Sequence, residues 1–394
     1  MKKGLILIFV LIAFFTLSIS TIIQTDERMN QAFAGQYYDE PLTDAPPLTD
    51  SDDISDAAPE DKPIKDSQSI SDSDITYDTT PLPQITEHSE QAIKTSGEYL
   101  GQKWFIDENH LLWWDGEPYI PYGLNAALTP KDGIKDFAIW SDPDFLGTDS
   151  ERFEWLDRLT DKITEQGGTY FMLFLLNPEL RDLSDLNKPR VKSQIELKWR
   201  KFAPAVRKKG LRAITFFNEI NMLKASRTIS LKEYGRILND YAKSLKEIVG
   251  NVPVILKIGG DWNIEPIMVT IQGDYVDGLG GDFFASEPDE NLKRQMVKPT
   301  TLLNQSKKTK LFWITELSRA AGGDAGTLWL KFENKNNMRS FLKAFLLYGA
   351  TGFFYFDIHP TADGYAQVTQ ETAKWFRELK SEVVKEILSF KKGG

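Results

Sequence analysis

The sequence predicts an α/β protein whose main domain is a (β/α)8 barrel. After residue 104, short β-branched and aromatic runs alternate with amphipathic stretches, the pattern of a parallel sheet covered by helices. The alternating region spans residues 119–388, which is close to the ~250 residues typical of such a barrel. Several predicted strands also end in polar residues, at the barrel face where enzymes of this fold carry their chemistry.

Residues 1–34 are predicted to be a signal peptide or a membrane anchor. Met1-Lys2-Lys3 precedes an apolar run over residues 4–23, a pattern that directs a chain into a secretion channel. This run is long enough to span a bilayer as a helix, whereas Ala32-Phe33-Ala34 is a small-x-small cleavage signal. The sequence therefore predicts an extracytoplasmic protein, either secreted or tethered to the membrane through residues 4–23.

Residues 35–96 are predicted to be a disordered acidic linker. The segment is rich in Asp, Ser, Thr and Pro and has too few large apolar residues to form a core. Between Asp39 and Glu90 there are 15 acidic residues and two lysines, which more than accounts for the net charge of −10. The rest of the chain is nearly neutral and has no basic stripe, so we expect no nucleic-acid binding. A specific acidic docking segment is the alternative to a plain spacer.

The domain predicted at 97–394 contains candidate strands and helices in alternation. The strands end near Asn125, Asn177, Asn218, Gly259, Asp282, Glu316 and Asp357. Apolar residues at three- and four-residue spacing predict helices over 151–166, 191–209, 231–249, 291–305, 334–347 and 371–388. The second strand must lie between residues 126 and 150, and we place it at 137–140. This placement leaves little room for a helix before it, so we expect a truncated first or second β/α unit.

Two glutamates follow apolar strands at a regular interval. Glu219 ends the run that begins at Ile214, and Glu316 ends a similar run 97 residues later. At ~30 residues for each strand and helix, this spacing corresponds to three units, which assigns the glutamates to strands four and seven. Because the carboxyl ends of barrel strands share one face, we expect the two carboxyl groups to lie together there.

An ordered set of motifs accompanies the glutamates: Phe105-Ile106-Asp107, the run 114–125, Asn218-Glu219, Thr315-Glu316 and the Gly-aromatic strand at 352–356. This set resembles the retaining (β/α)8 glycoside hydrolases of clan A, which include the family 5 cellulases and mannanases. The resemblance implies that Glu219 is the general acid/base, that Glu316 is the nucleophile and that Asn218 binds the sugar 2-hydroxyl.

Two carboxyl groups suit glycoside hydrolysis for a simple chemical reason. The glycosidic oxygen is a poor leaving group until it is protonated, and the oxocarbenium-like centre needs an anion on its other face. One glutamate must therefore be protonated while the other is ionised. In a retaining enzyme the ionised group attacks the sugar and forms a glycosyl ester, which water then hydrolyses.

The sequence departs from the family pattern in three places. The sixth strand commonly ends in His-x-Tyr, where the tyrosine hydroxyl contacts the nucleophile, but these positions are Asp282 and Phe284 here. The usual tryptophan of the eighth strand is replaced by Phe356, and no second-strand arginine is evident. Because phenylalanine cannot donate a hydrogen bond, the nucleophile would need another partner.

Further polar and aromatic side chains at predicted strand ends are candidates for substrate binding: Asn125, Asn177, Trp262, Asp282 and Phe356. Trp140 and Trp262 could stack on pyranose rings. The chain has no cysteine and three histidines, so we expect no metal and no cofactor.

The sequence therefore predicts an extracytoplasmic retaining glycoside hydrolase that cleaves a β-linked polysaccharide or oligosaccharide. One alternative is an inactive carbohydrate-binding barrel, for which Asp282 and Phe284 are the reason. The other is an envelope-organising protein that acts through its acidic tether. The sugar, the linkage, endo or exo action and the oligomeric state stay open.

Overall fold

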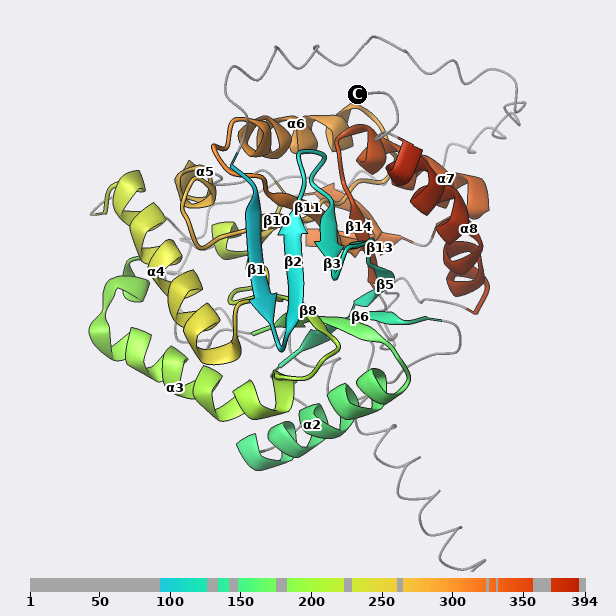
Figure 1. Cartoon of the computed structure of the whole chain (residues 1–394). Helices are drawn as coiled ribbons and strands as arrows, with labels where there is room; N and C mark the ends of the chain where they lie inside the picture. The colour runs from blue at the N-terminus through green and yellow to red at the C-terminus, as the bar shows by residue number, and fades with distance from the viewer. Residues whose placement is uncertain are drawn as a thin grey trace, which may run out of the picture. The chain divides into compact units, whose positions relative to one another are not determined.

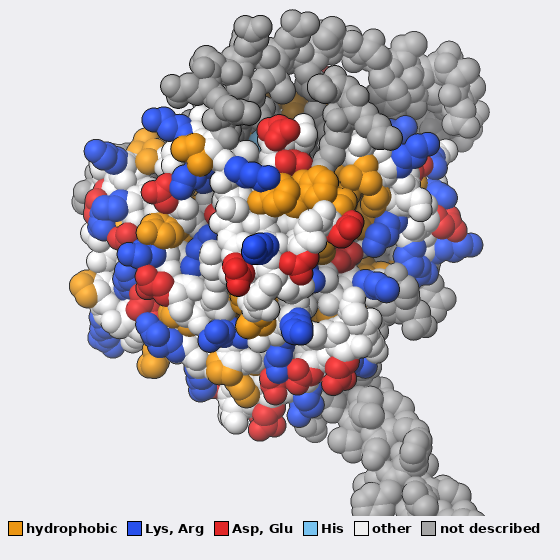
Figure 2. Space-filling view, viewed as in Figure 1, with side chains coloured by type: hydrophobic (Ala, Val, Ile, Leu, Met, Phe, Trp, Pro, Cys, Tyr) orange, Lys and Arg blue, Asp and Glu red, His pale blue; other side chains and the backbone are white. Residues whose placement is uncertain are grey.

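The computed structural model describes most of the chain after residue 92: residues 93–125, 134–141, 148–174, 183–222, 229–260, 265–323, 326–330, 332–356 and 370–389. The predicted signal segment and the predicted acidic linker up to residue 92 lie outside these residues, whereas residues 93–96 of that linker are described. Among the described residues, no helix is long and apolar enough to cross a membrane. The front face in Figure 2 carries positive and negative side chains interspersed, without a field of one sign.

Eight parallel strands form the main sheet, in the order β8-β7-β6-β5-β14-β11-β10-β9. Its two outer strands are joined by a parallel bridge between Ile214 and Val254 and by a hydrogen bond from Ile214 N to Pro253 O of 2.9 Å. The sheet thus closes into the predicted barrel (Figure 1). The strands are β5 (Tyr122–Asn125), β6 (Asp136–Trp140), β7 (Thr169–Leu173), β8 (Leu211–Thr215), β9 (Ile255–Gly259), β10 (Gly278–Asp282), β11 (Leu311–Leu317) and β14 (Gly352–Phe356).

Helices surround the barrel in the predicted order. They are α2 (Asp149–Glu165), α3 (Pro189–Val206), α4 (Leu231–Val249), α5 (Glu265–Ile271), α6 (Glu290–Asn304), α7 (Lys335–Leu347) and α8 (Gln370–Ser389), with 3-10 turns η1 (Leu183–Asn187) and η2 (Ile220–Met222). Several begin with a side-chain cap that satisfies free backbone N–H groups, such as the reciprocal Thr148 and Glu151 capping box of α2. Only ten residues separate β5 from β6, so the first β/α unit is short, as predicted.

A four-stranded antiparallel sheet covers the amino-terminal end of the barrel strands. It consists of β1 (Thr95–Tyr99), β2 (Gln102–Ile106), β3 (Leu112–Trp114) and β4 (Glu117–Tyr119), and it lies across the barrel in Figure 1. Trp104 Nε1 donates to Asn251 O at 2.7 Å, and Thr95 N donates to Thr309 Oγ1 at 2.9 Å. Both acceptors precede barrel strands, so the opposite end of the barrel is where a site can open.

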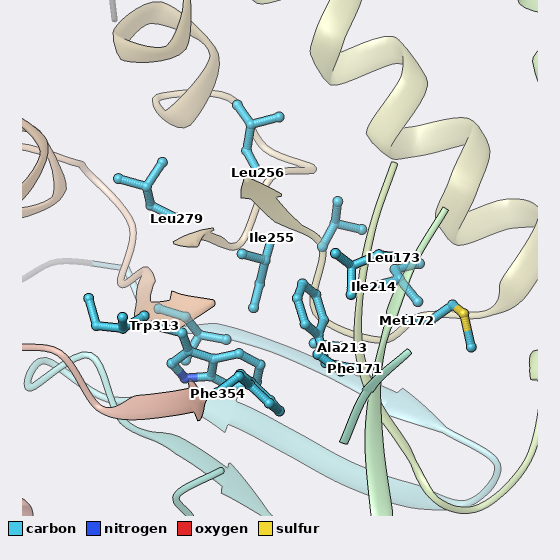
Figure 3. Close-up of a cluster of buried hydrophobic side chains, with 14 of the residues drawn as sticks. Phe171, Met172, Leu173, Ala213, Ile214, Ile255, Leu256, Leu279, Trp313 and Phe354 are labelled. Atoms are coloured by element: carbon cyan, nitrogen blue, oxygen red, sulfur yellow. The ribbon is translucent and has the colours of Figure 1, made fainter. Parts of the chain in front are cut away.

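Aliphatic and aromatic side chains pack together in the core (Figure 3). Phe171 of β7 lies 5.9 Å from Trp313 of β11 and 5.8 Å from Phe354 of β14, measured between ring centroids. Because β7 and β11 are not neighbours in the sheet, these contacts cross the barrel. The interior is therefore a packed core, as expected for this fold.

The structure differs from the prediction in five features. The antiparallel sheet, α5 and a hairpin of β12 (Arg319–Gly323) with β13 (Gly326–Leu330) were not predicted. The predicted domain boundary at residue 97 falls inside β1, so the ordered domain begins before it. β1 to β4 are short and polar on one side, so their sequences give only a weak strand pattern. Finally, β8 ends at Thr215, several residues before the predicted strand end at Asn218.

Candidate active site

Glu219 lies at the carboxyl end of the barrel on a strained turn. Three residues separate it from the end of β8, and its φ of 44° is in the left-handed region that non-glycine residues rarely occupy. The turn is fixed by Asn221, whose Nδ2 donates to Gly259 O at 2.8 Å and whose Oδ1 accepts from Gly259 N at 2.9 Å. These two bonds hold the Glu219 turn against the end of β9.

Gly259 provides the space that the Glu219 carboxyl group occupies. A Cβ atom at Gly259 would lie 2.6 Å from Glu219 Oε1, closer than side-chain atoms approach one another. The glycine is thus required by contact, because its backbone φ is not in the left-handed region. The carboxyl group of Glu219, on the turn after β8, consequently contacts the end of β9 directly.

Glu316 lies within β11, and only 5% of it is exposed. Its Oε1 accepts from Lys257 Nζ and lies 3.5 Å from Asn125 Nδ2. Asn125 is itself oriented by two further bonds, since its Nδ2 donates to Thr315 O at 2.6 Å and Trp140 Nε1 donates to its Oδ1 at 2.9 Å. Residues from β5, β6 and β9 thus fix the position of the Glu316 carboxylate.

A fully buried ion pair lies beneath Glu316. Lys257 Nζ is 2.8 Å from Asp282 Oδ2, and neither side chain has any exposed surface. Asp282 Oδ1 accepts from Thr315 Oγ1 at 2.6 Å, which links the pair back to β11. Lys257 Nζ also donates to Asn218 Oδ1. Four ionisable groups of the described chain therefore form one cluster: Glu219, Lys257, Asp282 and Glu316.

The cluster places the two glutamates in different electrostatic environments. Burial, reinforced by the negative charge of Glu316 and opposed by Lys257, raises the pKa of Glu219 to about 7. The carboxylates of Asp282 and Glu316 outweigh the effect of burial on Lys257 and raise the pKa of its ammonium group. Burial and the charge of Glu316 raise the pKa of Asp282, while Lys257 opposes this. Near neutral pH, Glu219 can therefore carry a proton while a cation faces Glu316.

The structure brings some of the predicted site residues together and not others. It brings Glu219, Glu316 and Asn218 together, as expected from their strand positions. Asn125 and Asp282 have no exposed surface, so a supporting role fits them better than the predicted contact with substrate. The predicted substrate-binding residues Asn177 and Trp262 lie outside the described residues.

The predicted aromatic positions lie at the rim of the barrel. Phe356 is the last residue of β14, is half-buried and pairs in register with Asn125. Phe284 follows β10 and is also half-buried. Arg319, at the start of β12, donates through Nε to Ser286 O at 2.8 Å and forms ion pairs with the carboxylates of Glu287 and Glu333.

Sequence reasoning missed Lys257 and Asn221. Lys257 was detectable, because it is the one charged residue in the apolar run from Val252 to Ile258, and a charge inside a buried strand needs a partner. Asn221 had no comparable signal, since its role depends on how the turn after Glu219 folds back onto β9.

The predicted (β/α)8 barrel is confirmed by the sheet order and by solved structures that share the fold. The chain is similar to the exo-β-1,4-mannosidase Op5Man5 from Opitutaceae bacterium strain TAV5, with a TM-score of 0.52 and 14% identity over 72% of this chain and 63% of that one. It is also similar to an endo-1,4-β-mannanase from Rhizomucor miehei, with a TM-score of 0.52 and 11% identity over 71% of this chain and 99% of that one.

A family 5 mannosidase from Rhizomucor miehei gives a TM-score of 0.50 and 10% identity over 72% of this chain and 98% of that one. No family model and no curated protein matches the sequence. At these identities the comparisons establish the barrel fold, and the chemistry must be argued from the site.

Proposed function

We propose that this protein is a retaining glycoside hydrolase that cleaves a β-linked polysaccharide outside the cytoplasm. One observation carries the proposal: Glu219 and Glu316 share a charge cluster in which the pKa of Glu219 is raised to about 7, while Lys257 contacts Glu316. This arrangement supplies a protonated acid and an ionised carboxylate at the same pH, as glycosidic cleavage requires.

In the proposed mechanism, Glu219 protonates the glycosidic oxygen while Glu316 attacks the anomeric carbon. The alcohol leaves and a glycosyl ester forms on Glu316. Glu219, now a carboxylate, takes a proton from water, and the water oxygen displaces Glu316 with net retention of the anomeric configuration. Asn218 lies beside both groups through its contact with Lys257, in a position to bind a sugar hydroxyl.

Export and the substrate class are parts of the same proposal. The apolar run at residues 4–23 and the acidic linker support secretion or a membrane tether for the domain. The structural neighbours named as a β-1,4-mannosidase and a β-1,4-mannanase suggest mannans as the first substrates to test.

The test is reducing-sugar release by the full chain from mannans, β-glucans, xylans and galactans, with Glu219→Gln and Glu316→Gln as matched variants. We expect one glycan to be cut, a loss of about 10³-fold or more in each variant and a product anomer that matches the substrate by NMR. The rate should fall above pH 7 as Glu219 loses its proton. Glycan binding without cleavage would favour the carbohydrate-binding alternative, for which the missing hydroxyl at Phe284 is the reason.

A further inference from the structure

Lys257 has an unusual position for a lysine. It is the central residue of β9, and its side chain is fully buried at the carboxyl end of the barrel. Burying an ammonium group costs several kcal/mol unless its partners compensate, and apolar side chains of similar volume are often more stabilising. A lysine at this position therefore calls for an explanation beyond stability.

Lys257 contacts three polar side chains. Its Nζ donates to Asn218 Oδ1 and to Glu316 Oε1, and it forms an ion pair with Asp282 Oδ2 at 2.8 Å. The acceptors come from three different segments, namely the turn after β8 and the strands β11 and β10. Lys257 thus fixes three groups relative to one another.

The contact with Asn218 also sets the orientation of that amide. Lysine only donates, so the amide oxygen of Asn218 must face Nζ and its Nδ2 must point the other way. The contact with Glu316 places a positive charge on one carboxylate oxygen. Asp282, anchored by Thr315, holds the ammonium group from its other side.

We propose that Lys257 is the positioning residue of this active site, which holds Glu316 aligned and orients Asn218 toward the substrate. This inference rests on the proposed function. Lys257 acts through Glu316 and Asn218 rather than on the substrate, and Asp282 and Thr315 keep its ammonium group in place. It supplies the partner that Phe284, which has no hydroxyl group, cannot provide.

The principal test is the pH profile of hydrolysis for Lys257→Met in the full chain. Loss of a neighbouring positive charge raises the pKa of a carboxyl group by about 1–3 units. Lys257 lowers the pKa of Glu219, so we expect the basic limb of kcat/KM, which reports the proton on Glu219, to move upward in Lys257→Met. We also expect kcat to fall by about 10²-fold at its optimum. A kcat within about threefold of the wild-type value, or a basic limb that does not move, would overturn the proposal.

Two further variants guard against a purely structural effect. Asp282→Asn keeps Lys257 and removes a carboxylate that is coupled to Glu219, so its basic limb should move downward, opposite to that of Lys257→Met. Lys310→Met removes a second fully buried lysine, located at the other end of the barrel, and should leave the pH profile unchanged. If Lys257→Met does not fold, the double variant Lys257→Met/Asp282→Asn replaces it, because it removes one charge of each sign. We expect the same fall in kcat for this double variant.

A measurement without turnover separates this inference from the proposed function. The 13C carboxyl resonance that disappears in Glu219→Gln can be titrated in the wild-type protein and in Lys257→Met. Because Lys257 lowers the pKa of Glu219, an upward shift of the midpoint in Lys257→Met supports the role of Lys257 even if no glycan is cut. An unchanged midpoint overturns that role even if the protein is an active hydrolase.

Discussion

Among the described residues, each end of the barrel buries one lysine, and the two lysines have opposite surroundings. At the carboxyl end, Lys257 contacts the carboxylates of Asp282 and Glu316. At the amino end, Lys310 donates to two backbone carbonyls, Gly273 O at 2.9 Å and Val276 O at 2.5 Å. Both residues are fully buried.

The difference in partners changes the sign of the pKa shift. Burial lowers the pKa of Lys310 to about 8, because neutral carbonyl groups only partly replace the lost hydration. Two anions instead raise the pKa of Lys257. At the amino end, the lysine thus satisfies two backbone carbonyl groups in the segment before β10. At the carboxyl end, the lysine keeps its positive charge beside the carboxyl groups of the candidate active site. This division agrees with barrels in general, whose amino face is associated with stability and whose carboxyl face carries activity.

The largest expected effect is on stability. Lys257→Met leaves the buried carboxylates of Asp282 and Glu316 without their cation, so the free energy of unfolding should fall by about 3–5 kcal/mol. Lys310→Met leaves two carbonyl groups without a donor and should cost about 1–3 kcal/mol. Urea unfolding of both variants at pH 7 measures the difference. Equal losses would mean that the two ends differ less than their contacts indicate.

A matched pair of glycines tests the same contrast through activity. In Gly259→Ala the new Cβ would lie 2.6 Å from Glu219 Oε1, so the acid should be displaced and hydrolysis should fall by about 10²-fold. In Gly278→Ala the new Cβ would lie 2.6 Å from Leu311 Cβ, at the amino end of β10. That variant should lose stability but retain its activity per folded molecule. A similar loss of kcat/KM in both variants would contradict the assignment of the site to one end.

The sequence also predicted the carboxyl end of the barrel better than the amino end. The strand ends at Asn125, Gly259, Asp282 and Glu316 were predicted within a residue or two, because apolar strands followed by polar residues give a strong local pattern. The paired glutamates followed from strand spacing alone. By contrast, the antiparallel sheet over the amino end was missed, since its strands are short and half-exposed. Lys257 was missed because its meaning depends on Asp282 and Glu316, which are 25 and 59 residues away in the chain.

The pH dependence of stability should come from the amino end above pH 8. The pKa of Lys310 is about 8 when folded and 10.5 when unfolded, so between these values the unfolded chain binds more protons and stability rises with pH. The wild-type protein should therefore gain about 2–3 kcal/mol relative to Lys310→Met from pH 7.5 to 10.5. Lys257, whose pKa is raised, contributes no slope in this range. Denaturant midpoints in buffers across the range measure the gain, and a constant difference would show that Lys310 stays protonated.

The smallest expected effect is a stability cost at the carboxyl end. The pKa of Glu219 is 4.5 when unfolded and about 7 when folded, so between these values the folded protein binds more protons and its stability falls as pH rises. Gln cannot titrate, and Glu219→Gln should gain about 1–2 kcal/mol relative to wild type between pH 4.5 and 8, since Glu219 is half-buried. Thermal unfolding across this range tests it. If Glu219→Gln is stabilised as pH rises while it loses hydrolysis, the protonated acid is kept at the expense of stability. If its stability relative to wild type does not change with pH, Glu219 is in ordinary contact with solvent.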